Sequence, residues 1–488
     1  MSFIQKLAGQ TAIYGLSSIV GRLLNFLLVP LYTSIFVPEE YGVLSELMAV
    51  IAFAMVVLTY GFETAFFHFT NKEKDTKQVL ATGFISLLAT SILFVSISWY
   101  NAENIADLFH LSSQPELIHW IIWIITLDVL STLPFAKLRV DQKAWRFAFI
   151  RIVNVVVNIG FNLSFFLACP YLQKEGLATN LLDLVYVPSL GIGYIFISNL
   201  LASATMLLLL TPEILKINGS FSLRLWKKMA KYSFPLLVGG LAYVTNEMAD
   251  RLLLEYLLPS DIATSEVGIY SACYKISIFM TLFIQAFRYG AEPFFFAQAK
   301  EKDAKEQYAT VMRYFIAFTG FIFLGINVFI DLIKHFIQNE AYHTGLTVVP
   351  ILLLANLFLG VYYNLSVWYK VSEKTQYGAY ISVFGAIITI LFNFILIPTM
   401  SYVGSAWATL ICYASMCIVS FLLSRRHYPI RYNWTRISFY LVSALSLFLI
   451  WDAWHDDFYI TSSIVCLLYI LGVFLLEKRK KIPILIGD

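Results

Sequence analysis

Long runs of apolar residues recur along this chain, and they restrict what it can fold into more than any other feature does. Each run contains about 20 residues, which is the length that a helix needs to cross a bilayer. Of the 488 residues, 59% are hydrophobic and only 13% are charged, whereas a soluble domain carries about 25% charged residues. A chain this apolar cannot cover its surface with polar groups, so we predict an all-α polytopic membrane protein.

The runs predict about fourteen transmembrane helices. Their expected bounds are 11–36, 41–66, 79–99, 117–136, 147–169, 186–210, 233–257, 267–290, 309–331, 346–369, 378–397, 403–423, 437–454 and 459–476. The first run continues to about Phe36 with no small-residue cleavage site. We therefore expect it to be retained as a span and not removed as a signal peptide.

An internal repeat relates the two halves of the chain. The stretch Tyr60–Phe67 matches the stretch Tyr289–Phe296, and each begins Tyr-Gly-x-Glu and leads into a Lys-Glu-Lys-Asp segment. Upstream, Tyr41–Ser45 resembles Val267–Ser271. We therefore expect two homologous lobes of six helices each. Because six is an even number, the lobes insert in the same orientation and are related by a pseudo-twofold axis along the membrane normal.

The basic residues predict how the chain is oriented in the membrane. They cluster in the loops after the second, fourth, sixth, eighth, tenth and twelfth runs and after the last run, whereas the opposite loops contain only Lys174 and Lys334. The clustered side is the cytoplasmic side by the positive-inside rule, so both termini are predicted to be cytoplasmic. The expected domains are an N-terminal lobe (1–211), a cytoplasmic linker (212–232), a C-terminal lobe (233–423), and a last segment with a basic loop, two extra helices and a basic tail (424–488).

Cysteine and histidine give no indication of a cofactor. The five cysteines fall inside apolar runs and form no CxxC pair, and the seven histidines are scattered without an HExxH pattern. The sequence therefore supports neither a disulfide framework nor a zinc site, and we expect no metal or other cofactor. The net charge of +3 does not indicate nucleic acid as a partner.

Four basic residues lie within the predicted spans, namely Arg22, Arg251, Lys275 and Arg288. A charge at the bilayer centre costs at least about 2.5–3.5 kcal/mol, so it should face a cavity or a partner. Arg251 and Lys275 each lie roughly 12 Å below the outer ends of their spans, at one level. We predict that Arg22, Arg251 and Lys275 are cavity cations that bind substrate. A structural ion pair stays open as an alternative for Arg251, and snorkelling to the interface stays open for Arg288.

Three acidic residues in the spans are candidate charge partners or ion relays. Asp128 is central in the fourth run, and it could relay a proton or ion or could pair with Arg22. Glu247 and Asp250 precede Arg251 closely, and the sequence leaves open which of the two neutralises it.

Asparagines at helical spacing extend two of these faces. Asn25 shares a face with Arg22, and Asn154 and Asn158 continue a stripe that begins at Arg151. The stripe either lines the cavity or joins helices through hydrogen bonds, which are worth about 0.6 kcal/mol each.

The acids Glu63 and Glu292 occupy matched positions in the two repeats, at the inner ends of the second and eighth runs. Their duplication favours a structural contact such as a cap or a gate, with contact to substrate as the alternative. Together, a cavity between two lobes with net positive charge suits an anion, because arginine and lysine are the side chains that bind phosphate. An anionic head group could occupy the cavity while its lipid tail stays in the bilayer, and rocking of the lobes would expose the site to each side in turn.

Several short stretches carry a family resemblance. They are Ala249–Leu254, Gly268–Ser271 with Tyr274 and Lys275, Phe287–Arg288 with Glu292–Phe294, Pro38–Gly42, and Lys137–Arg139 followed by Lys143 and Ala144. With the layout of twelve helices plus two, the chain resembles polysaccharide flippases of the O-antigen (Wzx-type) branch of the multidrug/oligosaccharidyl-lipid/polysaccharide exporter superfamily.

The resemblance implies a transporter and not an enzyme. It implies movement of undecaprenyl-diphosphate-linked oligosaccharide from the cytoplasmic to the periplasmic leaflet of the bacterial inner membrane, for the synthesis of surface polysaccharide. Related flippases use cavity arginines, and Arg22 and Arg251 lie in the comparable spans. The expected partners are this lipid-linked oligosaccharide, the lipid bilayer and the polysaccharide polymerase machinery.

Two other functions stay open. A cation-coupled drug or metabolite exporter of the same fold would need acidic cavity residues, which Asp128, Glu247 and Asp250 could supply, but the cavity cations argue against it. A lipid-linked-sugar polymerase or ligase is less favoured, because such enzymes generally need a sizeable outer loop and the outer loops here are short.

Overall fold

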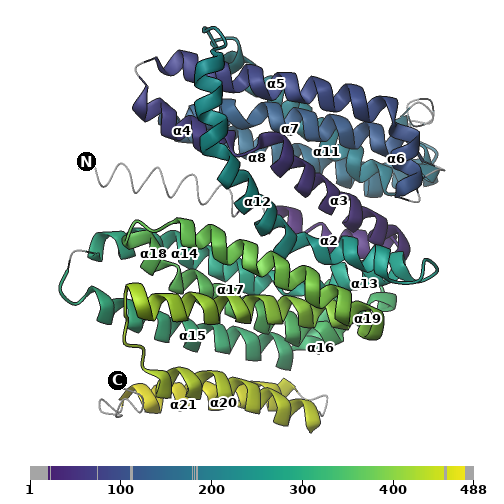
Figure 1. The fold of residues 1–488 in the computed structure, drawn as a ribbon. Coiled ribbons are helices and arrows are strands. Elements are labelled where there is room, and N and C mark those ends of the chain that lie inside the picture. The colour runs from purple at the N-terminus through teal and green to yellow at the C-terminus, as the bar shows by residue number, and fades with distance from the viewer. Residues whose placement is uncertain are drawn as a thin grey trace. The chain divides into compact units, whose positions relative to one another are not determined.

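The computed structural model describes residues 20–478 apart from 22, 74, 110, 112–113, 178–179, 181, 183–184, 300 and 455–458. All regular secondary structure in these residues is helical, with no strand among them (Figure 1). The prediction of an all-α membrane protein is confirmed. Arg22 lies outside the described residues, as do Lys74, Lys300 and the basic C-terminal tail after Lys478.

The chain forms two compact units. Unit 1 comprises residues 1–28 and 47–244, and unit 2 comprises residues 29–46 and 245–488. The helices α3 (Pro38–Thr59) and α12 (Leu223–Leu257) each pass from one unit into the other. The lobe boundaries expected from the sequence stay a prediction.

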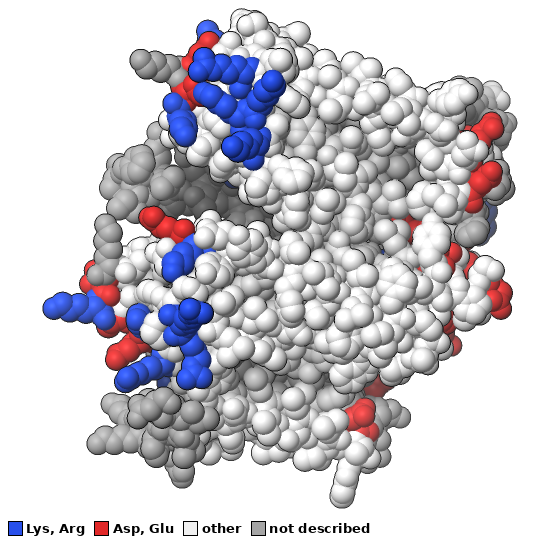
Figure 2. Space-filling view, viewed as in Figure 1, with Lys and Arg blue, Asp and Glu red and all other residues white. Residues whose placement is uncertain are grey.

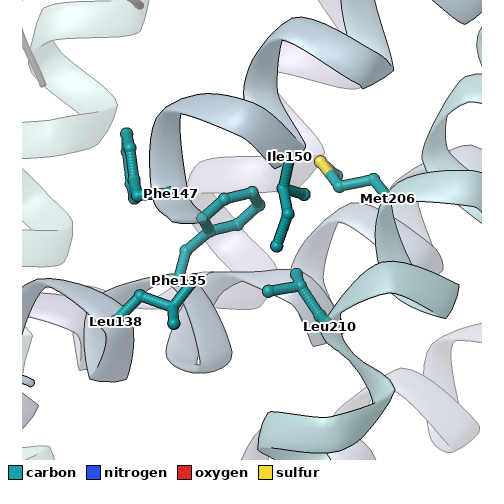
Figure 3. Close-up of a cluster of buried hydrophobic side chains, with 6 residues drawn as sticks. All are labelled: Phe135, Leu138, Phe147, Ile150, Met206 and Leu210. Carbon is teal, nitrogen blue, oxygen red and sulfur yellow. The ribbon is translucent and has the colours of Figure 1, made fainter. Parts of the chain in front are cut away.

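Unit 1 is built from helices that follow the predicted spans two to six. They are α4 (Phe62–Lys72), α5 (Thr76–Tyr100), α6 (Ala102–Leu108), α7 (Glu116–Val140), α8 (Ala144–Leu163), η1 (Ser164–Ala168), α9 (Cys169–Lys174), η2 (Pro188–Leu190) and α11 (Gly193–Ile214). Helix α11 packs against both α7 and α8. Six buried apolar side chains join these three helices, namely Phe135, Leu138, Phe147, Ile150, Met206 and Leu210 (Figure 3). Their burial fixes the spacing of the helix ends that carry the charged residues described below.

Unit 2 contains the remaining helices. They are α2 (Val29–Ile35), α13 (Ala263–Ile276), α14 (Ile278–Gln298), α15 (Ala304–Val328), α16 (Ile330–Ile333), η3 (Lys334–Phe336), η4 (Glu340–Val348), α17 (Val349–Leu365), α18 (Val367–Val371), α19 (Gln376–His427), α20 (Trp434–Ala453) and α21 (Tyr459–Lys478). The last two pack on α15, as expected for helices added to a complete bundle. Glu477 of α21 anchors them through Arg436 of α20 (3.1 Å) and Arg313 of α15 (3.3 Å).

The helix α19 contains two of the predicted spans. Ser401 has φ 50° and ψ −137°, and this break divides the helix. The Sγ atom of Cys412 lies 3.4 Å from the carbonyl oxygen of Gly385, so the two parts run side by side. A Cβ atom at Gly385 would lie 2.6 Å from the sulfur of Met416, which shows how closely they pack.

Among the described residues, ten helical segments are long and apolar enough to cross a membrane, and the bent pair α13 and α14 makes eleven. That pair turns by 47° at Ser277. The count of fourteen stays a prediction. On the face shown in Figure 2, the lysine and arginine side chains of each unit gather at one end of its helices, and most of the remaining surface is uncharged. This distribution suits helices that stand in a bilayer.

Two repeat-matched glycines meet inside unit 2. A Cβ atom on Gly42 would lie 1.9 Å from the carbonyl oxygen of Thr264, and one on Gly268 would lie 1.8 Å from the carbonyl oxygen of Pro38. The start of α3 therefore touches α13 backbone to backbone, and no side chain fits at either position. The repeated Gly-x-x-Ser pattern thus marks a helix contact.

Candidate functional site

Unit 1 contains a cavity of about 450 Å³. Parts of α3, α4, α7, α8 and α11 line it, through Met55, Val56, Thr59, Gly61, Glu63, Thr64, Asp128, Ser131, Thr132, Phe135, Arg139, Phe147, Arg151, Asn154, Asn199, Ser203 and Met206. The wall combines charged, amide and hydroxyl groups with apolar side chains of the cluster in Figure 3. This mixture is typical of a pocket for a polar ligand.

Arg151 and Asp128 form the charged inner wall of the cavity. The Arg151 guanidinium lies over the ring of Phe135, 4.6 Å from its centroid, and 5.8 Å from that of Phe147. The carboxyl group of Asp128 interacts with Arg151 and with the Ser203 hydroxyl. The buried Oδ1 atom of Asp128 has no hydrogen-bond partner among the described residues. Arg151 is exposed to the cavity, so stacking holds the cation in place without using up its hydrogen-bond donors.

A second arginine lies toward the end of α7. Arg139 donates to Oε1 of Glu63 at 2.8 Å, and its guanidinium stacks 4.8 Å from the centroid of Phe67. Glu63 can reach it because the chain breaks between α3 and α4 at Gly61, where φ is 72°. Both charged side chains are about half-exposed, so the pair is accessible to a ligand.

The predicted asparagine stripe divides between the two interpretations. Asn154 lines the cavity with Arg151. Asn158 instead accepts hydrogen bonds from the amide of Asn162, at 2.8 Å to its backbone oxygen and 3.0 Å to its side-chain oxygen. Asn25 is exposed and is not part of the cavity wall. The pairing of Arg22 with Asp128 falls on an undescribed residue and stays a prediction.

Arg251 lies in unit 2 and is only 5% exposed. Its guanidinium lies 2.6 Å from Oδ1 of Asp250, and it also donates to the backbone oxygen of Glu247 at 2.6 Å. The hydroxyl of Tyr270 donates to the other oxygen of Asp250, and the Tyr274 ring covers the guanidinium at 4.3 Å. Asp250 is thus the acid that neutralises Arg251.

The Glu247 carboxylate accepts from another partner, the hydroxyl of Tyr413, at 2.8 Å. Lys275 is near enough to Arg251 for their charges to interact. That both cations lie at one level stays a prediction. Lys275 makes no ion pair among the described residues. Two positive charges, Arg251 and Lys275, are therefore close together, and among the described residues only Arg251 has an acidic ion-pair partner.

The second repeat-matched acid also holds basic side chains. Oε1 of Glu292 accepts from Lys370 at 2.7 Å and lies 3.5 Å from Arg288. Arg288 in turn lies 4.1 Å from the ring centroid of Tyr363. Glu63 and Glu292 therefore occupy matching structural contacts, each with a cation two spans further along the chain.

Sequence reasoning assigned Arg139 to a cytoplasmic loop cluster and left Arg151 as the head of an ambiguous stripe, although both line the cavity. Asn199 and Ser203 of the cavity wall were missed. The i, i+4 spacing of these two residues in an apolar run was the signal that could have found them.

Comparison with known proteins agrees with this architecture. A family model described as polysaccharide biosynthesis protein matches residues 7–291, and a model named MatE matches residues 235–395. No curated protein sequence matches the chain. The structure of the lipid II flippase MurJ in an inward closed conformation is similar at 14% identity, with 95% of this chain and 97% of that chain covered and a TM-score of 0.74.

Two structures of multidrug resistance MATE family transporters of the MOP superfamily are also similar. The inward-facing one has 14% identity, covers 86% of this chain and 95% of its own, and gives a TM-score of 0.66. The outward-facing one has 15% identity, covers 90% and 96%, and gives 0.54. At such identities these likenesses show the fold alone. The family resemblance seen in the sequence is confirmed by the two family models. With more than half of its length matched by the family model, this chain belongs to the polysaccharide biosynthesis protein family.

Proposed function

We propose that this protein is a flippase that moves undecaprenyl-diphosphate-linked oligosaccharide from the cytoplasmic to the periplasmic leaflet of the bacterial inner membrane. The observation that carries the proposal is the cavity of unit 1, with Arg139 and Arg151 in its wall. Membership of the polysaccharide biosynthesis family and a fold shared with a lipid II flippase support it.

The two arginines suit a diphosphate. A guanidinium presents donors in a planar fork that matches two phosphate oxygens, and it keeps its charge at any physiological pH. Stacking on Phe135 holds Arg151 in place. The amides of Asn154 and Asn199 line the same cavity and can hydrogen-bond to sugar hydroxyls. The polyprenyl tail would stay in lipid, where apolar surface costs nothing.

The cations predicted from the sequence keep a proposed role in substrate binding. Arg251 is covered by Tyr270 and Tyr274 and bound to Asp250, so it can reach a phosphate only after these side chains move. Lys275 lies beside it without an acid of its own among the described residues. A site used in only one state of an alternating-access cycle would behave in this way.

The charge pattern supports cytoplasmic termini, and this orientation sets the direction of transport. Passing the lipid-linked unit to polymerase machinery on the periplasmic side completes the proposal. A cation-coupled exporter of the same fold is the second candidate. The observation that favours it is Oδ1 of Asp128, which has no hydrogen-bond partner within the described part of the chain.

Depletion of the protein from cells tests these two functions. The polyprenyl-diphosphate saccharides would be extracted, and the leaflet that holds them would be determined. If the protein is a flippase, a complete lipid-linked unit should accumulate on the cytoplasmic leaflet. Expression of the wild-type protein should then remove this accumulated lipid. A Lys334→Ala variant should also clear it, because this cation lies in an opposite loop, where it pairs with Asp331. An unchanged lipid pool with increased drug retention would show an exporter instead.

A further inference from the structure

Two buried carboxyl groups lie together in unit 2, and the cavity described above does not use them. Glu46 of α3 is 2% exposed and Glu255 of α12 is 7% exposed. The two side chains are near enough for their charges to repel each other. Oε1 of Glu46 and Oε2 of Glu255 are buried, and neither has a hydrogen-bond partner among the described residues. Each acid therefore presents an oxygen atom that its surroundings leave unsatisfied.

The contacts that the pair does make are with neutral groups. The Thr264 hydroxyl donates to Oε1 of Glu255 at 2.7 Å, and the phenol of Tyr256 hydrogen-bonds to Glu46. Arg251 lies one turn before Glu255 on α12, but its charge is already balanced by Asp250. No ion pair to either carboxyl occurs in the described part of the chain.

Charged and titratable groups on the surrounding elements do not compensate the pair. They are Glu39, Glu40 and Tyr41 on α3, Glu247, Asp250, Arg251 and Tyr256 on α12, and Glu266, Tyr270, Cys273, Tyr274 and Lys275 on α13. Lys275 lies about three turns along α13 from Thr264, the residue that binds Glu255. The acids among them cannot balance negative charge, and the Tyr270 hydroxyl is bonded to Asp250. Two carboxylates in one buried site cannot both be ionised without a cation, because burial and mutual repulsion both favour the neutral form of one.

Backbone packing holds the helix that carries Glu46 against the residue that binds Glu255. Gly42 lies one turn before Glu46 and contacts the carbonyl of Thr264, the residue whose hydroxyl binds Glu255. The glycine contact leaves no room for a side chain between α3 and α13. The pair can therefore become hydrated only if α3 moves away from the turn between α12 and α13. The ring of Tyr256 is 49% exposed, and it is the group that links Glu46 to the surface.

We propose that Glu46 and Glu255 together bind one proton, and that this carboxyl pair couples proton movement to transport. With α3 packed against α13, one carboxyl is a neutral acid. When the helices separate and water enters, the O–H bond of that acid breaks, the proton passes to water, and both groups become carboxylates. The coupling rests on the proposed transport function, whereas proton binding is a property of the folded chain alone.

Thermal unfolding of the purified full-length protein in lipid nanodiscs tests proton binding without any substrate. Unfolded glutamates lose their protons above about pH 4.3. A folded pair that keeps one proton therefore makes the protein less stable as the pH rises from about 5 to about 8. We expect this fall in melting temperature in the wild type and in Glu39→Gln, an exposed acid on the same helix. Glu46→Gln/Glu255→Gln should lose the part of the fall that the pair causes, and an unchanged fall would overturn the proposal.

Infrared spectroscopy covers the case in which the double variant does not fold. The wild type should show the carbonyl band of a protonated carboxyl above about pH 7, and Glu46→Gln or Glu255→Gln should each lose it. Absence of the band in the wild type would refute proton binding. Stabilisation of the wild type by Na⁺ at fixed pH, absent from the double variant, would assign the pair to a metal cation instead.

Transport in liposomes tests the coupling. Stimulation by a proton gradient should be lost in Glu46→Gln and retained in Glu39→Gln. If the proton gradient still stimulates transport in Glu46→Gln and Glu255→Gln, the carboxyl pair does not couple proton movement to transport. If the melting and infrared results hold but no lipid moves, the proton site stands and the proposed flippase function fails.

Discussion

Unit 1 and unit 2 differ in how accessible their central intramembrane arginines are. In unit 1, Arg151 faces a cavity, and the carboxylate oxygen of Asp128 beside it has no described partner. In unit 2, Arg251 is buried, bound to Asp250 and covered by two tyrosines. Accessible charges can bind a ligand, whereas a buried and satisfied ion pair mainly holds helices together. In the arrangement described here, unit 1 presents its charges to a ligand, whereas unit 2 keeps Arg251 in a closed ion pair.

The largest expected effect comes from removing one arginine from each unit. Arg251→Ala leaves Asp250 buried without its cation, so we expect a loss of about 3–5 kcal/mol in stability and poor expression. Arg151→Ala also removes the cation beside Asp128, but this carboxyl faces a cavity and keeps the Ser203 hydroxyl, so the loss of stability should be smaller than in Arg251→Ala. It should reduce lipid transport on the order of 10- to 100-fold. Melting temperature and transport rate, measured on both variants, check this.

Arg151→Lys serves as the control, because it keeps the charge and loses the planar fork, so it should restore transport in part. Normal stability of Arg251→Ala with abolished transport would break the comparison, since Arg251 would then be a binding residue like Arg151.

The second prediction uses the repeat-matched glycines Gly61 and Gly290. Gly61 has φ 72° and a Cβ atom there would lie 3.1 Å from Leu236, whereas Gly290 lies within α14 with nothing within 4 Å of its Cβ position. Gly61→Ala should cost about 1–2 kcal/mol, because alanine is strained in the left-handed region. Gly290→Ala should be neutral or should stabilise by up to about 1 kcal/mol.

Thermal unfolding of the two glycine variants decides the matter, with the wild type measured beside them. Equal losses would mean that both positions break their helices, and the two repeats would then be more alike than the structure shows.

The smallest effect is expected from the matched acids. Glu63→Gln removes a half-exposed pair with Arg139, and such pairs are worth about 0–1 kcal/mol. Glu292→Gln removes contacts with both Lys370 and Arg288, so its loss should be the larger of the two. Both variants should impair folding or gating more than the apparent affinity for the lipid, which can be read from the dependence of the transport rate on substrate concentration. A change in affinity alone would move the acid concerned into the binding site.

Much of the fold could be predicted because a chain in a bilayer must form its backbone hydrogen bonds within each helix. Each such helix is visible in the sequence as a run of apolar residues. The repeat also matched Glu63 with Glu292, and each has a basic partner in the structure, whereas their role as a cap or a gate stays a prediction. The hairpin within α19 was predicted as two spans, although its two parts join at a single non-helical residue, Ser401. The cavity was predicted less well, because Arg139 looked like one more cation of a cytoplasmic loop.

What the sequence by itself determined is the class of protein, the internal repeat and which charges are too costly to lie in lipid. Helical periodicity also showed which residues share one face of one helix, such as Arg151 and Asn154. The tertiary structure decided which helices meet. It placed Asp128 of α7 beside Arg151 of α8, made Asp250 the ion-pair partner of Arg251, and brought Glu46 near Glu255. These contacts join residues on different helices or depend on side-chain direction, and packing of the whole bundle sets both, which no local pattern encodes.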